Sequence, residues 1–354
     1  LRFTVIYLAP LGQDVLFSTA KCEIGRNFAN KIWNAARFLA MNKAKVETRG
    51  EFVFRDGRFR AVDAPVQLPL SPAAMEIEDR WIFSRLHETI RQLRDSMEKY
   101  RVNDASKALY DFIWHDFCDW YIELIKDRLF SSDEKLQRVT LERAYAVFDA
   151  ILKLLHPFMP FITEELWHAL EPGREERSIM NEQLPVFDPA AVDAHAEETM
   201  AFMQALVDGV RGIRGEMNVP PPKPCALVIN CGSEAHRAAI EESTHFLERL
   251  ARITDVRVGS GLPRPKLSAS VVVAGEDVYM PLEGLIDIAM ERKRLSKEIG
   301  RVTGLLNGIE SKLGNDKFLS SAPADVVERE REKRDHFRTT LDKLNANLHA
   351  LEQE

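Results

Sequence analysis

One amphipathic segment, GRNFANKIWNAARFLAMN at residues 25–42, carries the side chains best suited to chemistry with another molecule. Read as a helix at ~100° per residue, it has three stripes. The apolar stripe contains Phe28, Ile32, Ala35 and Leu39. A second stripe contains Asn27, Lys31, Asn34 and Phe38, and a third contains Arg26, Asn30 and Arg37. Amides, guanidinium groups and an aromatic ring bind base edges and phosphates and stack on unpaired bases. The pattern predicts a helix that faces RNA, and packing of Phe38 on a neighbouring helix is the alternative.

Charge is spread unevenly along the chain. A formal net charge of −7 over 354 residues argues against a general polyanion binder. Residues 1–60 nevertheless hold eleven Lys and Arg against five Asp and Glu. A basic end on an acidic body indicates a localised phosphate-facing surface, whose alternative is a merely solvated basic face. Its candidate cations are Lys21, Arg26, Lys31 and Arg37.

The spacing of the other reactive residues does not indicate a catalytic or metal-binding site. Asp116, Asp119 and Glu123 have helical spacings at which carboxylates are usually solvated or paired with Lys and Arg, and no nucleophile accompanies them. The four cysteines form no C-x-x-C pair and have no His at ligand spacing, so we expect neither disulfides nor a zinc site. The sequence has no Gly-rich phosphate loop, signal peptide or apolar run of ~18 residues, which predicts a soluble, cytoplasmic protein with no membrane partner.

The periodicity predicts a mainly α fold in three domains. An antiparallel helical bundle is expected over residues 1–190, with helices at 22–44, 75–100, 104–129, 133–155 and 163–170. A small α+β module is expected over 191–282, with strands at 225–230, 256–258, 269–274 and 279–282 and helices at 194–217 and 234–253. Heptad-like apolar runs on both sides of residues 314–323 predict an antiparallel coiled-coil hairpin over 283–354.

Aromatic residues in the bundle are expected to fill its core. They are Trp114, Trp120, Tyr121, Phe158, Phe161 and Trp167. His156 stands before Pro157 at a hinge between two helices, where we expect a structural histidine that is hydrogen-bonded to the backbone.

Five segments in order resemble the C-terminal portion of valyl-tRNA synthetases. They are NFANKIWNAARFLAMN at 27–42, DWYIE at 119–123 with Lys126 behind it, LHPFMPFITEELW at 155–167, RGEMNVPP at 214–221 and NDKFLSSAPADVV at 315–327. The class I catalytic signatures H-I-G-H and K-M-S-K-S do not occur in the chain. The resemblance therefore implies a class I anticodon-binding bundle and a tRNA-binding coiled-coil arm, without aminoacylation by this chain alone.

The resemblance also implies what the parent enzyme does. It attaches valine to valine-specific tRNA, using ATP and Mg in a catalytic domain, and it edits mischarged tRNA in a separate domain. Editing is needed because an apolar pocket rejects threonine only weakly. No cofactor is expected in this chain, and its expected partners are tRNA and the catalytic and editing domains of the same polypeptide.

The same resemblance assigns candidate tRNA contacts. In the bundle they are Lys21, Arg26, Asn27, Lys31, Asn34, Arg37 and Phe38, of which Phe38 is expected to stack on an anticodon base. Relatives often have a basic residue one place before Lys21, where this chain has Ala20. In the arm the candidates are Arg292, Lys297, Lys317, Phe318 and Lys333. Residues 283–354 hold thirteen basic and fourteen acidic residues, so arm contacts must rely on shape and a few positioned groups.

Two alternatives remain open at this level. The chain could be the equivalent region of an isoleucyl or leucyl enzyme, although the C-terminal heptads and the lack of zinc cysteines disfavour both. It could also be a helical scaffold that binds protein through its coiled coil, with no RNA role. Salt-sensitive binding of tRNA separates the scaffold from the other two.

Overall fold

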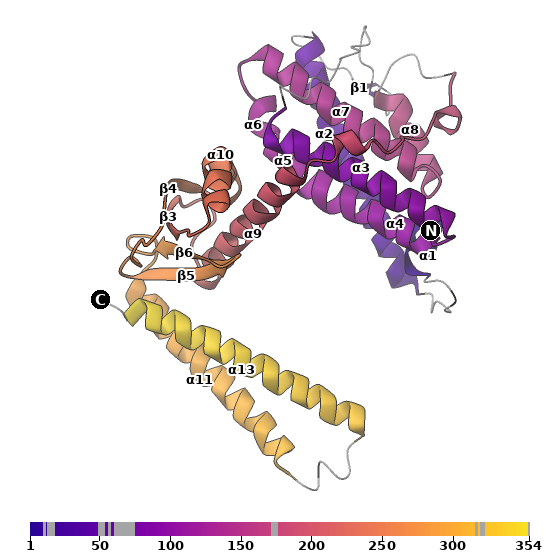
Figure 1. The fold of residues 1–354 in the computed structure, drawn as a ribbon. Helices are drawn as coiled ribbons and strands as arrows, with labels where there is room; N and C mark the ends of the chain where they lie inside the picture. The colour runs from indigo at the N-terminus through magenta and orange to yellow at the C-terminus, as the bar shows by residue number, and fades with distance from the viewer. Residues whose placement is uncertain are drawn as a thin grey trace. The chain divides into compact units, whose positions relative to one another are not determined.

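A computed structural model describes residues 1–9, 12, 18–48, 54–55, 58–59, 75–170, 176–315, 318 and 323–352. The chain forms two compact units, Leu1–Met200 and Ala201–Glu354. The first unit is a helical bundle, and the second combines a four-stranded sheet with a long helical hairpin (Figure 1). The mainly α fold class with its small α+β module and C-terminal hairpin is thereby confirmed, while the three-domain division stays a prediction.

In its described residues, the first unit has six principal helices. They are α1 (Arg2–Leu8), α2 (Cys22–Thr48), α3 (Ile77–Glu98), α4 (Val102–Asp111), α7 (Glu134–Leu155) and α8 (Pro160–Leu170). Between α4 and α7 the chain continues through a π-helical segment η3 (Phe112–Tyr121) and two short helices, α5 (Ile122–Leu124) and α6 (Lys126–Leu129). The predicted helix at 104–129 is therefore interrupted, and sequence periodicity does not reveal a π-helical stretch of this kind.

Short elements complete this unit. The described 3₁₀ turns include η1 (Thr19–Lys21), η4 (Ile179–Asn181) and η5 (Pro189–Ala191). The strands β1 (Phe54–Arg55) and β2 (Arg58–Phe59) pair antiparallel.

A glycine allows α2 to lie close to α1. A Cβ atom on Gly25 would stand 2.3 Å from Oγ1 of Thr4, closer than non-bonded atoms can approach. Phe3 and Phe28 meet across the same contact, with ring centroids 4.8 Å apart. This contact fixes the N-terminal half of α2, the helix that carries the predicted RNA-facing stripes.

The hinge between α7 and α8 has a structural role. Nδ1 of His156 lies 2.7 Å from Oγ1 of the buried Thr163, so the partner is a side-chain hydroxyl and not the expected backbone group. Phe158 and Trp167 are buried as expected, but Phe161 is 89% exposed. Phe161 is the second residue of α8 and points outward, which corrects its assignment to the core.

A buried ionic network crosses the centre of the bundle. Arg128 forms two hydrogen bonds with Asp79, at 2.7 and 2.9 Å, and Arg143 adds a third at 2.6 Å. The hydroxyl of Tyr121, from the DWYIE segment, donates to the same carboxylate at 2.9 Å. Burial opposes ionisation of Asp79, but these partners hold its pKa below the usual value. Burial raises the pKa of the adjacent Glu78 to about 7, although Arg128 also contacts it.

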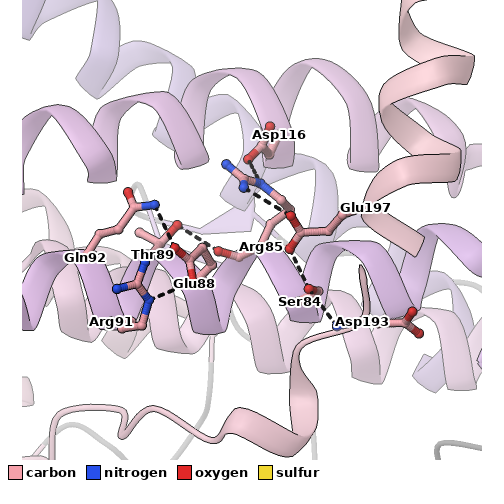
Figure 2. Close-up of polar contacts among 9 residues, drawn as sticks. All are labelled: Ser84, Arg85, Glu88, Thr89, Arg91, Gln92, Asp116, Asp193 and Glu197. Atoms are coloured by element: carbon pink, nitrogen blue, oxygen red, sulfur yellow. Dashed lines mark hydrogen bonds and ion pairs between the residues drawn. The ribbon is translucent and has the colours of Figure 1, made fainter. Parts of the chain in front are cut away.

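A second polar cluster fastens residues 193–197 to α3 (Figure 2). Arg85 pairs with Asp116 at 2.9 Å and with Glu197 at 3.6 Å. Ser84 donates to Glu197 at 2.6 Å and accepts from the backbone N–H of Asp193 at 3.0 Å. These contacts occupy Asp116, as the helical spacing of the acidic residues predicted.

The second unit contains a mixed sheet. Its strands are β3 (Cys225–Asn230), β4 (Ile253–Gly259), β5 (Ser268–Val273) and β6 (Glu276–Pro281), in the order β4-β3-β6-β5. The β3 and β4 strands are parallel and are joined by α10 (Glu234–Ala251), while β6 is antiparallel to both β3 and β5. Ala274 and Gly275 both have positive φ, the geometry of a tight turn between twisted strands.

Arg214 organises the triple-proline boundary. It lies near the end of α9 (Ala194–Glu216), and its buried guanidinium donates to the carbonyls of Pro220, Pro221 and Lys223 at 2.8–3.0 Å. A run of prolines cannot continue a helix or a sheet ladder, so its carbonyls need donors from elsewhere. The RGEMNVPP segment thus has a clear structural function.

The C-terminal hairpin pairs α11 (Ile288–Leu313) with α13 (Ala324–Glu352). Its seam follows the predicted heptads, with Leu295, Val302 and Leu306 buried on one limb and Leu351 on the other. Asp287 caps the start of α11 by accepting from the backbone N–H of Met290 at 3.0 Å. At 1.5 Å per residue, limbs of this length extend about 40 Å.

Two features of the whole chain complete the description. All five tryptophans of the sequence, Trp33, Trp81, Trp114, Trp120 and Trp167, belong to the first unit. Within the part of the chain that the structure describes, no helix has the length and apolar character needed to cross a bilayer.

Candidate nucleic-acid interface

The α2 helix separates a packing face from an outward face. Phe28, Ile32 and Leu39 are fully buried, as the periodicity predicted. Asn27, Asn34 and Arg37 are exposed on the other side. The helix therefore presents two amides and a guanidinium group to solvent, held in place by its apolar stripe.

Two of the predicted cations on α2 are engaged within the bundle. Arg26 pairs with Glu23 one turn before it, at 3.2 Å. Lys31 forms an ion pair with Asp119 of the DWYIE segment, and its Nζ lies 5.3 Å from the centroid of the Trp114 ring. Lys21 is half-buried in η1, immediately before α2. The positive charge of these residues remains near the surface, but part of it is already neutralised.

Arg37 differs from these cations. Among the residues that the structure describes, the side chain of Arg37 has no hydrogen-bond or ion-pair partner. The side chains of Asn27 and Asn34 have none either. Exposed amide and guanidinium groups without partners can donate to a base or phosphate without first breaking an internal bond.

Phe38 is half-buried and lies against Lys126 of α6 and Phe130, the residue that follows α6. The ring of Phe130 meets it edge-on, with centroids 6.5 Å apart and planes at 84°. Nζ of Lys126 lies 5.7 Å from the Phe38 centroid and is paired with Glu123 at 2.5 Å. Phe130 is 59% exposed, so this group offers an aromatic surface next to a positive charge.

Neither Phe130 nor the contact between Lys126 and Phe38 was predicted from the sequence. Lys126 and Phe130 lie on α6 and at its end, about ninety residues away along the chain, and no periodicity links them to α2. The only available signal was the position of Lys126 behind the DWYIE segment. Folding also places Lys31 and Asp119 together, so the same segment contacts α2 at two points.

The arm candidates lie in several different environments. Arg292 donates to the backbone carbonyl of Leu351 at 2.8 Å and so anchors the end of α13. Lys333 is exposed and pairs at 2.8 Å with Glu330, whose side chain is only 12% exposed. Lys297 is exposed and, within the described ranges, lacks an ion-pair partner. Phe318 is half-buried next to Asn315, and Lys317 lies outside the described residues.

Most arginines of the arm are paired with nearby carboxylates. Arg301 pairs with Glu298 at 2.6 Å, and Arg338 pairs across the hairpin with Glu310 at 2.6 Å. Side chains in these pairs remain 35–59% exposed. The arm therefore presents alternating charges and not a continuous basic strip, which agrees with the near-balance of charge in its sequence.

Family comparisons match both units. A family described as the anticodon-binding domain of tRNA ligase matches residues 79–229. A second family, described as the valyl tRNA synthetase tRNA binding arm, matches residues 287–352.

Curated relatives cover almost the whole chain. A valine–tRNA ligase of Chlorobaculum tepidum is 40% identical over 99% of this chain and 38% of its own length. Valine–tRNA ligases of Geobacillus kaustophilus and Fusobacterium nucleatum are 38% and 34% identical, each over 100% of this chain and 38% of their own length. The chain thus spans less than two fifths of the relatives that it matches.

Proposed function

Because the chain belongs to the valyl-tRNA synthetase family, we propose that it binds valine-specific tRNA through two surfaces. The bundle binds the anticodon loop along α2, and the coiled-coil hairpin contacts the body of the tRNA. The family description of each matched region supports this assignment.

The observation that carries the proposal is the outward face of α2. Asn27, Asn34 and Arg37 are exposed and lack partners within the described residues, and Phe38 lies beside them. Unpaired bases of an anticodon loop expose their edges and faces, which such donors and a ring can bind. On the arm, Lys297 and Lys333 are the exposed candidates, and Arg292 contributes by holding the two limbs together.

We further propose that the chain acts as part of an enzyme that attaches valine to tRNA with ATP and Mg. The catalytic and editing steps belong to other domains of that polypeptide, since the H-I-G-H and K-M-S-K-S signatures do not occur among these residues. The chain by itself should therefore give no amino-acid-dependent ATP–pyrophosphate exchange.

A tRNA titration tests the proposal. The purified chain is titrated with tRNA that carries a valine anticodon and with the same tRNA carrying a different anticodon, at several salt concentrations. We expect tighter binding of the valine anticodon, and weaker binding of both as salt rises, because phosphate contacts release counterions.

Equal affinity for the two tRNAs would contradict anticodon reading by α2. No salt-sensitive binding of either tRNA would favour the protein-binding scaffold. Pyrophosphate exchange above a buffer control would contradict the assignment of catalysis to other domains.

A further inference from the structure

Three potential metal ligands meet at one end of the sheet in the second unit. Cys231 directly follows β3, His236 lies in the first turn of α10, and Glu276 is the first residue of β6. One ligand atom from each lies within 4.8 Å of the other two. Ligands of a tetrahedral metal at about 2.0–2.3 Å are themselves about 3–4 Å apart, so the cluster needs little adjustment to surround an ion.

We propose that Cys231, His236 and Glu276 form a binding site for a divalent transition metal ion of the zinc type. A thiolate, an imidazole and a carboxylate are all ligands of Zn²⁺, and the soft sulfur disfavours Mg²⁺ and Ca²⁺. Two anionic ligands balance the charge of the ion. Three protein ligands leave a fourth position for water.

The groups around the cluster hold two of the ligands in place. The carboxylate of Glu276 accepts from the backbone N–H of Gly232 at 2.7 Å and of Ser233 at 3.2 Å. The His236 ring stacks on Phe202, with centroids 4.1 Å apart and planes at 1°. Outer contacts of this kind orient metal ligands and strengthen binding.

The backbone fixes the third ligand. Cys231 is fully buried, and its N–H donates to the carbonyl of Gly259 at 2.8 Å. Its thiol donates to the backbone carbonyl of Ser233 at 3.4 Å, which holds it beside the cluster. The partly exposed His236 leaves a route for an ion from solvent.

The same contacts also have a purely structural interpretation. Nδ1 of His236 lies 2.8 Å from Oε1 of Glu276, and Glu276 caps the turn before α10. A carboxylate has about four lone-pair sites, so it can keep its two backbone bonds and still bind an ion. The ion would replace the hydrogen bond between His236 and Glu276, and binding would release the thiol proton of Cys231 to solvent.

The test is a Co²⁺ titration of the full chain after treatment with a chelator and a reductant. Co²⁺ replaces Zn²⁺ in such sites and gives a thiolate charge-transfer absorption band when sulfur binds it. We expect one equivalent of Co²⁺ to produce this band and Zn²⁺ to displace it. Cys231→Ser should abolish the band, and the matched variant Cys22→Ser, which changes a thiol in the first unit, should keep it.

A second variant separates binding from folding. Glu276→Gln keeps an oxygen that can accept from the backbone, and it should weaken Co²⁺ binding by at least roughly tenfold. Circular dichroism of each variant checks that the second unit remains folded. The proposal is wrong if the wild-type chain shows no such band, or if Cys231→Ser retains it.

Discussion

The bundle and the arm place the same types of charged residue in opposite environments, one buried and one exposed to solvent. In the bundle, Asp79 and Arg143 have side chains that are 0% and 5% exposed, and they form one connected network with Arg128. In the arm, Arg338 and Glu310 remain 56% and 38% exposed and pair across the two limbs. Removing one partner of a buried pair strongly lowers the free energy of unfolding, whereas exposed pairs contribute little to it.

The difference extends to RNA binding. An arm cation such as Arg301 must give up Glu298 before it can pair fully with a phosphate. Arg37 on α2 has no such competitor among the described residues. We therefore expect substitutions in the bundle to change both stability and tRNA affinity more strongly than equivalent substitutions in the arm.

The largest effect is expected when the buried network is broken. Asp79→Ala should lower the free energy of unfolding by about 3–5 kcal/mol, because it removes the buried carboxylate that Arg128 and Arg143 share. The matched arm variant Glu310→Ala should lower it by at most about 1 kcal/mol. Urea unfolding followed by circular dichroism measures both, and similar losses in the two variants would refute the comparison.

The pH dependence of stability also tests how burial affects a charged residue of the bundle. Burial raises the pKa of Glu78 from 4.5 to about 7, so the folded state holds its proton more tightly than the unfolded state. The stabilisation is complete below about pH 4.5 and is lost as the pH rises through about 7, a change of about 3 kcal/mol. Glu78→Gln should remove this loss, so the variant should gain stability relative to wild type on going from low to neutral pH. An unchanged difference between the two proteins across this range would show that Glu78 does not titrate there.

A variant of Phe38 tests whether its ring on α2 binds a base. Phe38→Ala should weaken tRNA binding by about 1–3 kcal/mol, or roughly fivefold to a hundredfold, if a base stacks on the ring. The slope of log K against log salt should change little, since no phosphate contact is lost. If Phe38 only packs against Phe130, the melting temperature should fall while affinity per folded molecule stays the same.

The smallest effect is expected from single cations. Arg37→Ala should lower the magnitude of the salt slope by about one unit if it binds a phosphate, or relax one base preference if it reads a base edge. Arg301→Ala should change the slope less, because Glu298 already occupies that side chain. A larger change of the salt slope for Arg301→Ala than for Arg37→Ala would contradict the expectation that substitutions in the bundle affect tRNA binding more strongly than those in the arm.

Local order was well predicted from the sequence. Heptad positions such as Leu295 and Leu351 are buried, and the strand at 225–230 has the predicted ends. These features depend on spacing within one segment, which a sequence displays directly. The π-helical turn in η3 and the exposure of Phe161 depend on packing between segments and were missed.

The candidate interface was only partly predictable for the same reason. The outward stripe of α2 follows from helical spacing, and Asn27, Asn34 and Arg37 are indeed exposed. The approach of Phe130 to Phe38, and the pairing of Lys31 with Asp119, join residues about ninety positions apart. Cys231, His236 and Glu276 likewise have no motif spacing and meet only when the sheet forms.

The restriction of all five tryptophans to the first unit makes the two units spectroscopically distinct. Excitation of indole reports only on the bundle, where Trp167 is buried and Trp33 is partly exposed. The sheet and hairpin contribute no tryptophan emission, although they add to the far-ultraviolet dichroism. A protein in which emission and dichroism change at different denaturant concentrations would have units that unfold separately, and this can be read from the natural sequence without any label.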